Sequence, residues 1–187
     1  RRANLATGID LRVLRQSLTA LAGLPPHLCV AVNVTPSTLS HPDVAATVRQ
    51  WLEQDGLAAP RLHLEITESD LLTLTPAVKA TIEELAALGV RWLIDDFGTG
   101  FSSISHLRDL PIHAIKLDRS FTAAIATGDQ KSVRLAQALA GLAEGLGLDT
   151  RWPKGWSRPP RRPSSPRCRA APVLLASGRG GRRRTPR

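Results

Sequence analysis

Apolar and polar positions alternate along the chain between two kinds of segment. Residues 10–24 carry apolar side chains at helical spacing, whereas residues 28–34, LCVAVNV, form a short β-branched run that predicts a buried strand. The same succession repeats along the chain. It predicts further strands over residues 61–66, 90–94 and 114–117, and further helices over residues 42–54, 76–88, 101–110 and 132–146.

The predicted elements form a βαβα repetition with short connections, which favours an α/β fold with a parallel sheet buried between helices. A complete (β/α)8 barrel of the TIM type needs about 250 residues, and this chain has 187. The pattern therefore leaves two architectures open. One is part of such a barrel, and the other is a doubly wound sheet.

Polar residues stand at the carboxyl end of every predicted strand. Because the carboxyl ends of parallel strands share one rim, where ligands bind, we expect these side chains to converge. Their amide and carboxylate oxygens suit a hard cation such as Mg²⁺ or Mn²⁺. Turn formation accounts for any one of these residues, but less well for the same pattern on four consecutive strands. The residues are Asn33, Glu65, Thr67, Glu68, Asp95, Asp96, Lys116 and Asp118.

Two adjacent carboxylates, Asp95 and Asp96, end the third predicted strand in RWLIDDFGTGFSS. Neighbouring carboxylates repel, and burial of either one without compensation is costly. Positive charge is therefore expected beside them, from divalent cations or from Lys116. The glycine-rich turn at residues 98–100 is weak evidence for phosphate binding, and it can equally be a simple turn or a loop that responds to substrate.

The basic charge is confined to the end of the chain. The net charge is +9, but residues 151–187 hold eleven Arg, one Lys and no acid, which leaves 13 basic against 16 acidic residues in 1–150. We therefore divide the chain into a domain over 1–150 and an Arg/Pro-rich tail over 151–187, which is expected to be disordered. Such a tail would bind nucleic acid non-specifically, but no nucleic-acid motif accompanies it.

No apolar stretch is long enough to span a bilayer, and the first residues lack the features of a signal peptide. We expect a cytoplasmic location, although a larger parent protein could be anchored in a membrane.

Four segments resemble, in order and spacing, the EAL domain of bacterial cyclic di-GMP phosphodiesterases. They are VAVNVTPSTL, RLHLEITES, LIDDFGTGFSSISHLRDLPIHAIKLDRSF and ALAGLAEGLGL. The resemblance implies a modified (β/α)8 barrel, of which this chain would hold roughly strands 2 to 5. It also implies hydrolysis of cyclic di-GMP to linear pGpG with two Mg²⁺ or Mn²⁺ ions, a homodimer, and an upstream sensory or GGDEF-type domain in the parent.

The resemblance further implies roles for the residues at the expected rim. Asn33, Glu65 and Asp95 correspond to metal ligands, and Asp96 corresponds to the carboxylate that serves the second metal. Lys116 corresponds to the lysine that orients the attacking water or the phosphate.

A loop next to this rim is also implied to take part. Glu68 corresponds to the glutamate that anchors residues 96–103, a loop that couples metal binding to dimerisation in the family. The positions expected to support the site are Thr67, Gly98, Ser102 and Asp118.

The chain departs from the family pattern at two places. No Glu-Ala-Leu signature occurs before residue 10, and the Val-x-Glu-Gly-Val-Glu motif expected after LGLDT is replaced by RWPKGWSRPPRRP. The glutamates of both motifs, one of them the general base of the family, are therefore absent. We expect an impaired fragment of a phosphodiesterase. The alternatives are an inactive EAL domain that binds cyclic di-GMP or a protein partner, and a nucleic-acid binder that uses the tail.

The second missing motif is recovered when WPKGWS, residues 152–157, is read from one base earlier. Tryptophan has the single codon TGG, and GC-rich codons for the other residues then give Val-Ala-Glu-Gly-Val-Glu. We therefore expect a change of reading frame after about residue 150, so that the tail is an out-of-frame translation.

Overall fold

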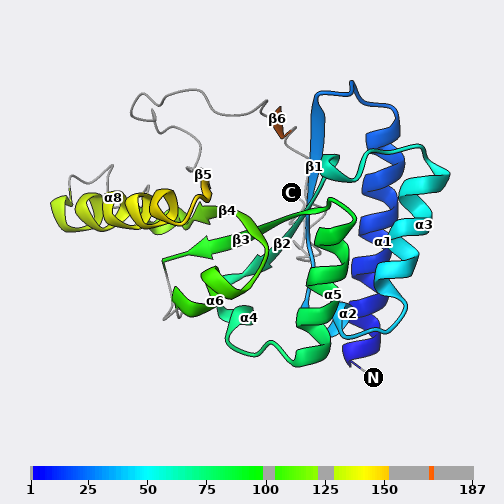
Figure 1. Ribbon diagram of the computed structural model, residues 1–187, viewed down its shortest axis with the longest axis horizontal. Coiled ribbons are helices and arrows are strands. Elements are labelled where there is room, and N and C mark those ends of the chain that lie inside the picture. The colour runs from blue at the N-terminus through cyan, green and yellow to red at the C-terminus, as the bar shows by residue number, and fades with distance from the viewer. Residues whose placement is uncertain (1, 99–103, 122–128, 152–168, 171–187) are drawn as a thin grey trace, which may run out of the picture.

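The sheet is parallel throughout. The computed structural model describes residues 2–98, 104–121, 129–151 and 169–170. Its strands lie in the order β5-β4-β3-β2-β1-β6, and each strand is parallel to its neighbours (Figure 1). They are β1 (Leu28–Asn33), β2 (Leu62–Thr67), β3 (Arg91–Phe97), β4 (Ile112–Leu117), β5 (Asp149–Arg151) and β6 (Arg169–Ala170).

The strand order decides between the two predicted architectures. Strands β1 to β5 are neighbours in the order of the chain, without a reversal. A doubly wound sheet reverses its strand order at a switch point, whereas the strands of a (β/α)8 barrel follow one another in sequence. The α/β class is therefore confirmed, and the sheet is a segment of a barrel.

Helices connect the successive strands. In Figure 1, α1, α3 and α5 lie side by side; α1 contacts β1 and α5 contacts β3, whereas α8 lies beside β4 and β5. The predicted helices are present, although the first begins at Arg2 rather than at residue 10, and residues 101–103 of the fourth lie outside the described residues. The long helices are α1 (Arg2–Ala22), α3 (Val44–Gln54), α5 (Pro76–Ala87) and α8 (Gln130–Gly145). The short ones are α2 (Pro36–Leu39), η1 (Ala59–Arg61), α4 (Glu68–Leu71) and α6 (Ile104–Asp109).

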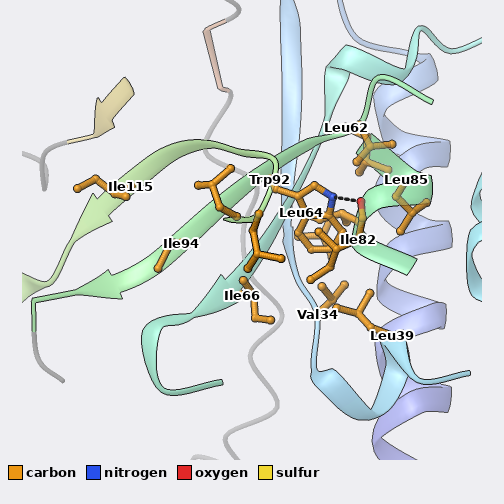
Figure 2. Packing of buried hydrophobic residues seen from close by; sticks show 14 of the residues in the cluster. Val34, Leu39, Leu62, Leu64, Ile66, Ile82, Leu85, Trp92, Ile94 and Ile115 are labelled. Carbon is orange, nitrogen blue, oxygen red and sulfur yellow. Dashed lines mark hydrogen bonds between the residues drawn. The ribbon is translucent and has the colours of Figure 1, made fainter. Parts of the chain in front are cut away.

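The core lies between the sheet and the helices that cover β1 to β3. Residues 62–66 of β2 are buried without interruption, as expected of a strand covered on both faces. Trp92 of β3 is fully buried, and its Nε1 donates a hydrogen bond to the Ile82 carbonyl of α5 at 3.1 Å (Figure 2). A buried indole needs such a partner for its N–H. This contact fixes β3, the strand that carries Asp95 and Asp96, against α5.

The short strand β6 departs from the tail that the composition predicts. The sequence of 151–187 predicts no regular structure, whereas Arg169–Ala170 pairs in parallel with Leu28 and Cys29 at the outer edge of β1. A strand edge presents N–H and C=O groups that another segment can satisfy. Residues 152–168 and 171–187 lie outside the described residues, so the disorder predicted for them stays a prediction.

Arg61 fastens the turn between α1 and β1. Its Nε donates to the Leu28 carbonyl at 2.9 Å, and its Nη2 lies 3.0–3.2 Å from three further carbonyls. Those carbonyls belong to Leu21, Leu24 and Pro25. Because the last carbonyls of a helix lack partners within the helix, a side-chain donor at this position satisfies them.

Substitution of Arg61 with methionine is expected to lower the free energy of unfolding by about 2 kcal/mol, because four main-chain carbonyls, three of them in part-buried hydrogen bonds, lose a charged donor. Urea denaturation followed by circular dichroism measures the change. Arg49→Met is the matched control, since Arg49 forms an exposed ion pair with Glu84 at 3.3 Å and its replacement should cost little. Equal losses in the two variants would contradict the role of Arg61.

Candidate functional site

The carboxyl ends of β1 to β4 bring the predicted polar residues to one rim. Asn33 of β1 is in register with Glu65 of β2, and Thr67 at the end of β2 is in register with Asp95 of β3. The rim is therefore fixed by parallel pairing of adjacent strands. Asn33 is exposed there, whereas the side chain of Glu65 is only 5% exposed.

Lys116 of β4 supplies the positive charge that the buried carboxylate requires. Its Nζ lies 2.7 Å from Glu65 Oε2 and 3.0 Å from Asp95 Oδ2. Burial by itself would lower the pKa of Lys116, but Glu65 and then Asp95 outweigh burial and raise the pKa above its ordinary value. Lys116 is therefore a fixed cation held between two strand-end carboxylates.

The two adjacent aspartates are separated by an unusual backbone conformation. Asp96 has a φ of 54°, in the left-handed region that non-glycine residues seldom adopt. The Asp96 N–H donates to Asp95 Oδ1 at 3.0 Å, so both oxygens of Asp95 are engaged, one by this amide and the other by Lys116. The strained turn lets neighbouring carboxylates make different contacts.

Asp96 interacts with Asp118 at the same rim. Desolvation, followed by the negative charges of Asp95 and Asp118, raises the pKa of Asp96, and a side-chain hydrogen bond with Asp118 acts in the same direction. Burial by itself would raise the pKa of Asp118 as well, but hydrogen bonds from Ser120 outweigh it and lower this pKa. The Ser120 N–H lies 2.7 Å from Asp118 Oδ1. Of the pair, Asp96 is therefore the one that holds a proton more readily.

Glu68 holds the start of the glycine-rich turn. It is the first residue of α4 and is 3% exposed, and its Oε2 accepts a hydrogen bond from the Gly98 N–H at 2.7 Å. Thr67 caps α4, because its Oγ1 accepts from the Asp70 N–H at 3.3 Å and donates to Asp70 Oδ2 at 2.6 Å. The cap orients α4 and, with it, Glu68. Ser102 and the rest of the loop at 99–103 lie outside the described residues.

The metal cluster expected from the sequence is only partly assembled. Among the described residues, no group of three or more His, Cys, Asp or Glu side chains is placed to hold a metal ion. Glu65 and Asp95 do converge, but they converge on Lys116, while Asp96 interacts with Asp118 instead. The donor chemistry nevertheless suits a hard cation, because the two carboxylates already hold a positive charge between them.

Two residues of this rim were not predicted. Asp10 of α1 binds Thr35 and Thr38 just beyond β1, and Asp70 closes the cap of α4. The spacing Thr67-x-x-Asp70 is a capping signal that the sequence does contain. Asp10 gives no local signal, since its partners lie 25 and 28 residues away.

The chain belongs to the EAL domain family, because the family model for the EAL domain matches residues 1–151. It is 42% identical over 144 residues to the cyclic di-GMP phosphodiesterase NbdA of Pseudomonas aeruginosa, a match that covers 75% of this chain and 18% of that protein. It is 44% identical over 138 residues to the uncharacterized protein y4lL of Sinorhizobium fredii, over 74% of this chain and 17% of that protein. The chain thus spans less than a fifth of the length of these relatives.

Two solved structures share the fold. The phosphodiesterase PaMucR in complex with c-di-GMP matches with a TM-score of 0.74 and 30% identity, over 81% of this chain and 67% of that one. The EAL domain of Mycobacterium smegmatis DcpA matches with a TM-score of 0.74 and 30% identity, over 81% of this chain and 70% of that one. The partial barrel predicted from the sequence is therefore confirmed.

Within the described part of the chain, no helix combines the length and the apolar character needed to cross a membrane.

At the opposite end of the strands, His113 of β4 contacts the backbone of β3. Its Nδ1 accepts a hydrogen bond from the backbone N–H of Trp92 at 3.2 Å, which requires that this ring nitrogen carry no proton. Desolvation, followed by the Arg91 guanidinium, lowers the pKa of His113 below its ordinary value. The folded chain therefore binds this proton less tightly than the unfolded chain.

We expect the His113 pKa, measured from the ring carbon-bound protons by NMR, to lie below 6.5. Between that pKa and 6.5 the unfolded state binds more protons, so stability should fall as the pH is lowered through this interval. Arg91→Gln should raise the His113 pKa towards its ordinary value, and His113→Gln should flatten the pH dependence of stability there. A pKa above 6.5 in the wild-type chain would refute the assignment.

Proposed function

We propose that this chain carries the cyclic di-GMP site of an EAL-type phosphodiesterase, whose complete form hydrolyses cyclic di-GMP to pGpG. The observation that carries the proposal is the cluster of Glu65, Asp95 and Lys116 at the carboxyl rim. The proposal is supported by the membership of the chain in the EAL family. It is also supported by the similarity to the phosphodiesterase NbdA and to PaMucR, whose structure is a c-di-GMP complex.

Each rim residue has a proposed task. Asn33, Glu65 and Asp95 would hold one Mg²⁺ or Mn²⁺ ion, and Asp96 would serve a second. Bound metal ions lower the pKa of a water molecule and neutralise charge on the phosphodiester. Lys116 keeps Glu65 and Asp95 in place and presents a positive charge with which it can orient the attacking water or the phosphate.

Glu68 is proposed to report the state of the site to a dimer partner. It is fixed on α4 and holds the Gly98 amide, so a movement of the turn after β3 would be passed to α4. By the same proposal, the EAL domain is cytoplasmic and forms a homodimer in the intact protein, and the parent, which could be anchored in a membrane, has room for a sensory or GGDEF-type domain upstream.

The 187-residue chain is expected to hydrolyse cyclic di-GMP far more slowly than an intact EAL domain. Residues 152–157 read WPKGWS where the family carries two glutamates. When several residues act as one catalytic unit, loss of a single member removes most of the activity. Chromatography of reactions with Mn²⁺ measures pGpG, and calorimetry with cyclic di-GMP and Mn²⁺ measures binding. Fast turnover would contradict the expected impairment.

Binding without turnover would favour the second candidate function, a receptor for cyclic di-GMP. The loss of both glutamates with retention of Glu65, Asp95 and Lys116 is the observation that favours it. Asp95→Asn should abolish binding, whereas Asp109→Asn is the control, since Asp109 forms an exposed pair with its neighbour Arg108. A chain that binds neither Mn²⁺ nor cyclic di-GMP would overturn the proposal as a whole.

We also propose that the domain ends near residue 150 and that 151–187 are translated out of frame. The match to the EAL family stops at Arg151, next to the point where the shifted reading of WPKGWS restores Val-Ala-Glu-Gly-Val-Glu. Resequencing of the gene tests this. The expected codons for residues 151–157 contain that motif in the neighbouring frame, and any other set of codons refutes the idea.

A further inference from the structure

We propose that Asp10 is a positioning residue for Asn33 and acts through the turn that follows β1. The inference rests on the proposed function, because it concerns a residue proposed to hold a metal ion. Asp10 lies on α1 (Arg2–Ala22), while Asn33 is the last residue of β1. Asp10 forms hydrogen bonds with Thr35, which follows Asn33 by two residues along the chain.

One oxygen of Asp10 accepts three hydrogen bonds from the turn. Asp10 Oδ2 lies 3.0 Å from the Thr35 N–H nitrogen, 2.8 Å from Thr35 Oγ1 and 2.6 Å from Thr38 Oγ1. Thr38 is fully buried, and Asp10 and Thr35 are half-buried. Hydrogen bonds to an ionised carboxylate are shorter and stronger than neutral ones, so this contact binds the turn firmly to α1.

The turn is also held from the side of the sheet. The Val34 N–H donates to the Glu65 carbonyl at 2.9 Å, and Thr35 caps α2, with its Oγ1 3.4 Å from the Thr38 nitrogen. Asn33 therefore precedes a segment that is fixed to Glu65 on one side and to Asp10 on the other. Glu65 and Asn33 are two of the three proposed ligands of the first metal ion.

This arrangement has the properties of an outer support for a metal ligand. An exposed asparagine binds a metal ion well only if its main chain is held in the right place, and partners outside the ligand set typically change metal affinity by about 10- to 100-fold. Asp10 would not touch the metal or the substrate. Its effect would reach the site only through the position of Asn33.

The test measures Mn²⁺ binding to the full 187-residue chain, from the electron paramagnetic resonance signal of free Mn²⁺. Asp10→Ala should weaken binding by about tenfold or more, and Asp10→Asn, which keeps the shape but loses the charge, should fall between this variant and the wild type. Asp55→Ala is the matched control. Asp55 also forms an ion pair with a residue of α1, Arg15, at 2.6 Å, but this pair connects α1 to the end of α3 and not to the turn after β1. It should leave Mn²⁺ affinity unchanged. All variants are compared at a temperature where circular dichroism shows them folded.

A second measurement separates positioning from general stability. In an Asn33→Ala background, Asp10→Asn should cause no further loss of Mn²⁺ affinity, because the residue through which it acts has been removed. An equal loss in both backgrounds, or an unchanged affinity of Asp10→Ala in the wild-type background, would overturn the positioning role and leave the metal site standing. A wild-type chain that binds no Mn²⁺ would instead overturn the proposed function, and the role of Asp10 with it.

Discussion

Replacement of Lys116 with methionine is expected to lower the free energy of unfolding by about 3–5 kcal/mol at neutral pH, because it removes one partner of a buried ion pair. The side chain of Glu65 is only 5% exposed and lies 2.7 Å from the Lys116 ammonium. Without that ammonium, a buried carboxylate lacks its counter-ion, and Asp95 adds a second negative charge nearby. Urea denaturation of both chains measures the difference.

Two further variants test this explanation. Glu65→Gln combined with Lys116→Met removes both charges and should recover much of the lost stability, since a neutral pair carries no uncompensated charge. Arg108→Met controls for the loss of a basic residue, because the Arg108 side chain is 74% exposed and forms its ion pair with the neighbouring Asp109. If the double variant were as unstable as Lys116→Met, the loss would have to come from packing rather than from charge.

A cation that replaces the ammonium should have the opposite effect. If Glu65 and Asp95 bind Mn²⁺ as proposed, Mn²⁺ should stabilise Lys116→Met more than it stabilises the wild-type chain, where Lys116 already holds that place. Among the described residues, no group of three or more His, Cys, Asp or Glu side chains is placed to hold a metal ion, and the Lys116 ammonium is the positive charge that balances Glu65 and Asp95.

Replacement of Gly98 with alanine is the second large effect that we expect, a loss of about 3 kcal/mol or more. Gly98 has a φ of 100°, which residues other than glycine seldom adopt. A Cβ there would lie 2.6 Å from Phe121 Cε2 and 2.8 Å from Leu139 Cδ1. Relief of that clash would shift the Gly98 amide away from the buried carboxylate of Glu68.

Gly147→Ala is the matched control for this substitution. Gly147 also has a positive φ, 74°, but a Cβ there would meet nothing within 4 Å. It should therefore show only the backbone cost, about 1–2 kcal/mol. Thermal and urea denaturation of the two variants give the comparison, and similar losses would mean that contact with Phe121 and Leu139 contributes little.

The strands, the parallel sheet and the common rim could be predicted because each depends on local pattern. Apolar runs ending in Asn33, Glu65 and Asp95 identify strands that present polar residues at one end, and parallel pairing then places those ends together. The same pattern left the barrel and the doubly wound sheet undecided, since strand order depends on contacts between distant segments. The resemblance to the EAL domain supplied that missing information.

The details of the site could not be read in the same way. Lys116 bridges two carboxylates because of the way in which β2, β3 and β4 are aligned. The different contacts of Asp95 and Asp96 depend on the left-handed backbone conformation of Asp96, which the sequence Asp-Asp does not reveal. The hydrogen bonds of Asp10 connect α1 with the turn after β1, two segments that are far apart in sequence. Such contacts follow from the assembled fold and leave no periodic trace.

The sequential strand order also bears on how the chain folds. Each pairing among β1 to β5 joins strands that are consecutive in the chain, so the loop closed at each step is of moderate length, and we expect the sheet to grow one strand at a time as the chain leaves the ribosome. Pairing of β6 with β1 is different, because Leu28 meets Arg169 from the far end of the chain. Among the described pairings, that closure carries the largest entropic cost for only two residues of pairing, so we expect β6 to be the last strand to form and the first to open.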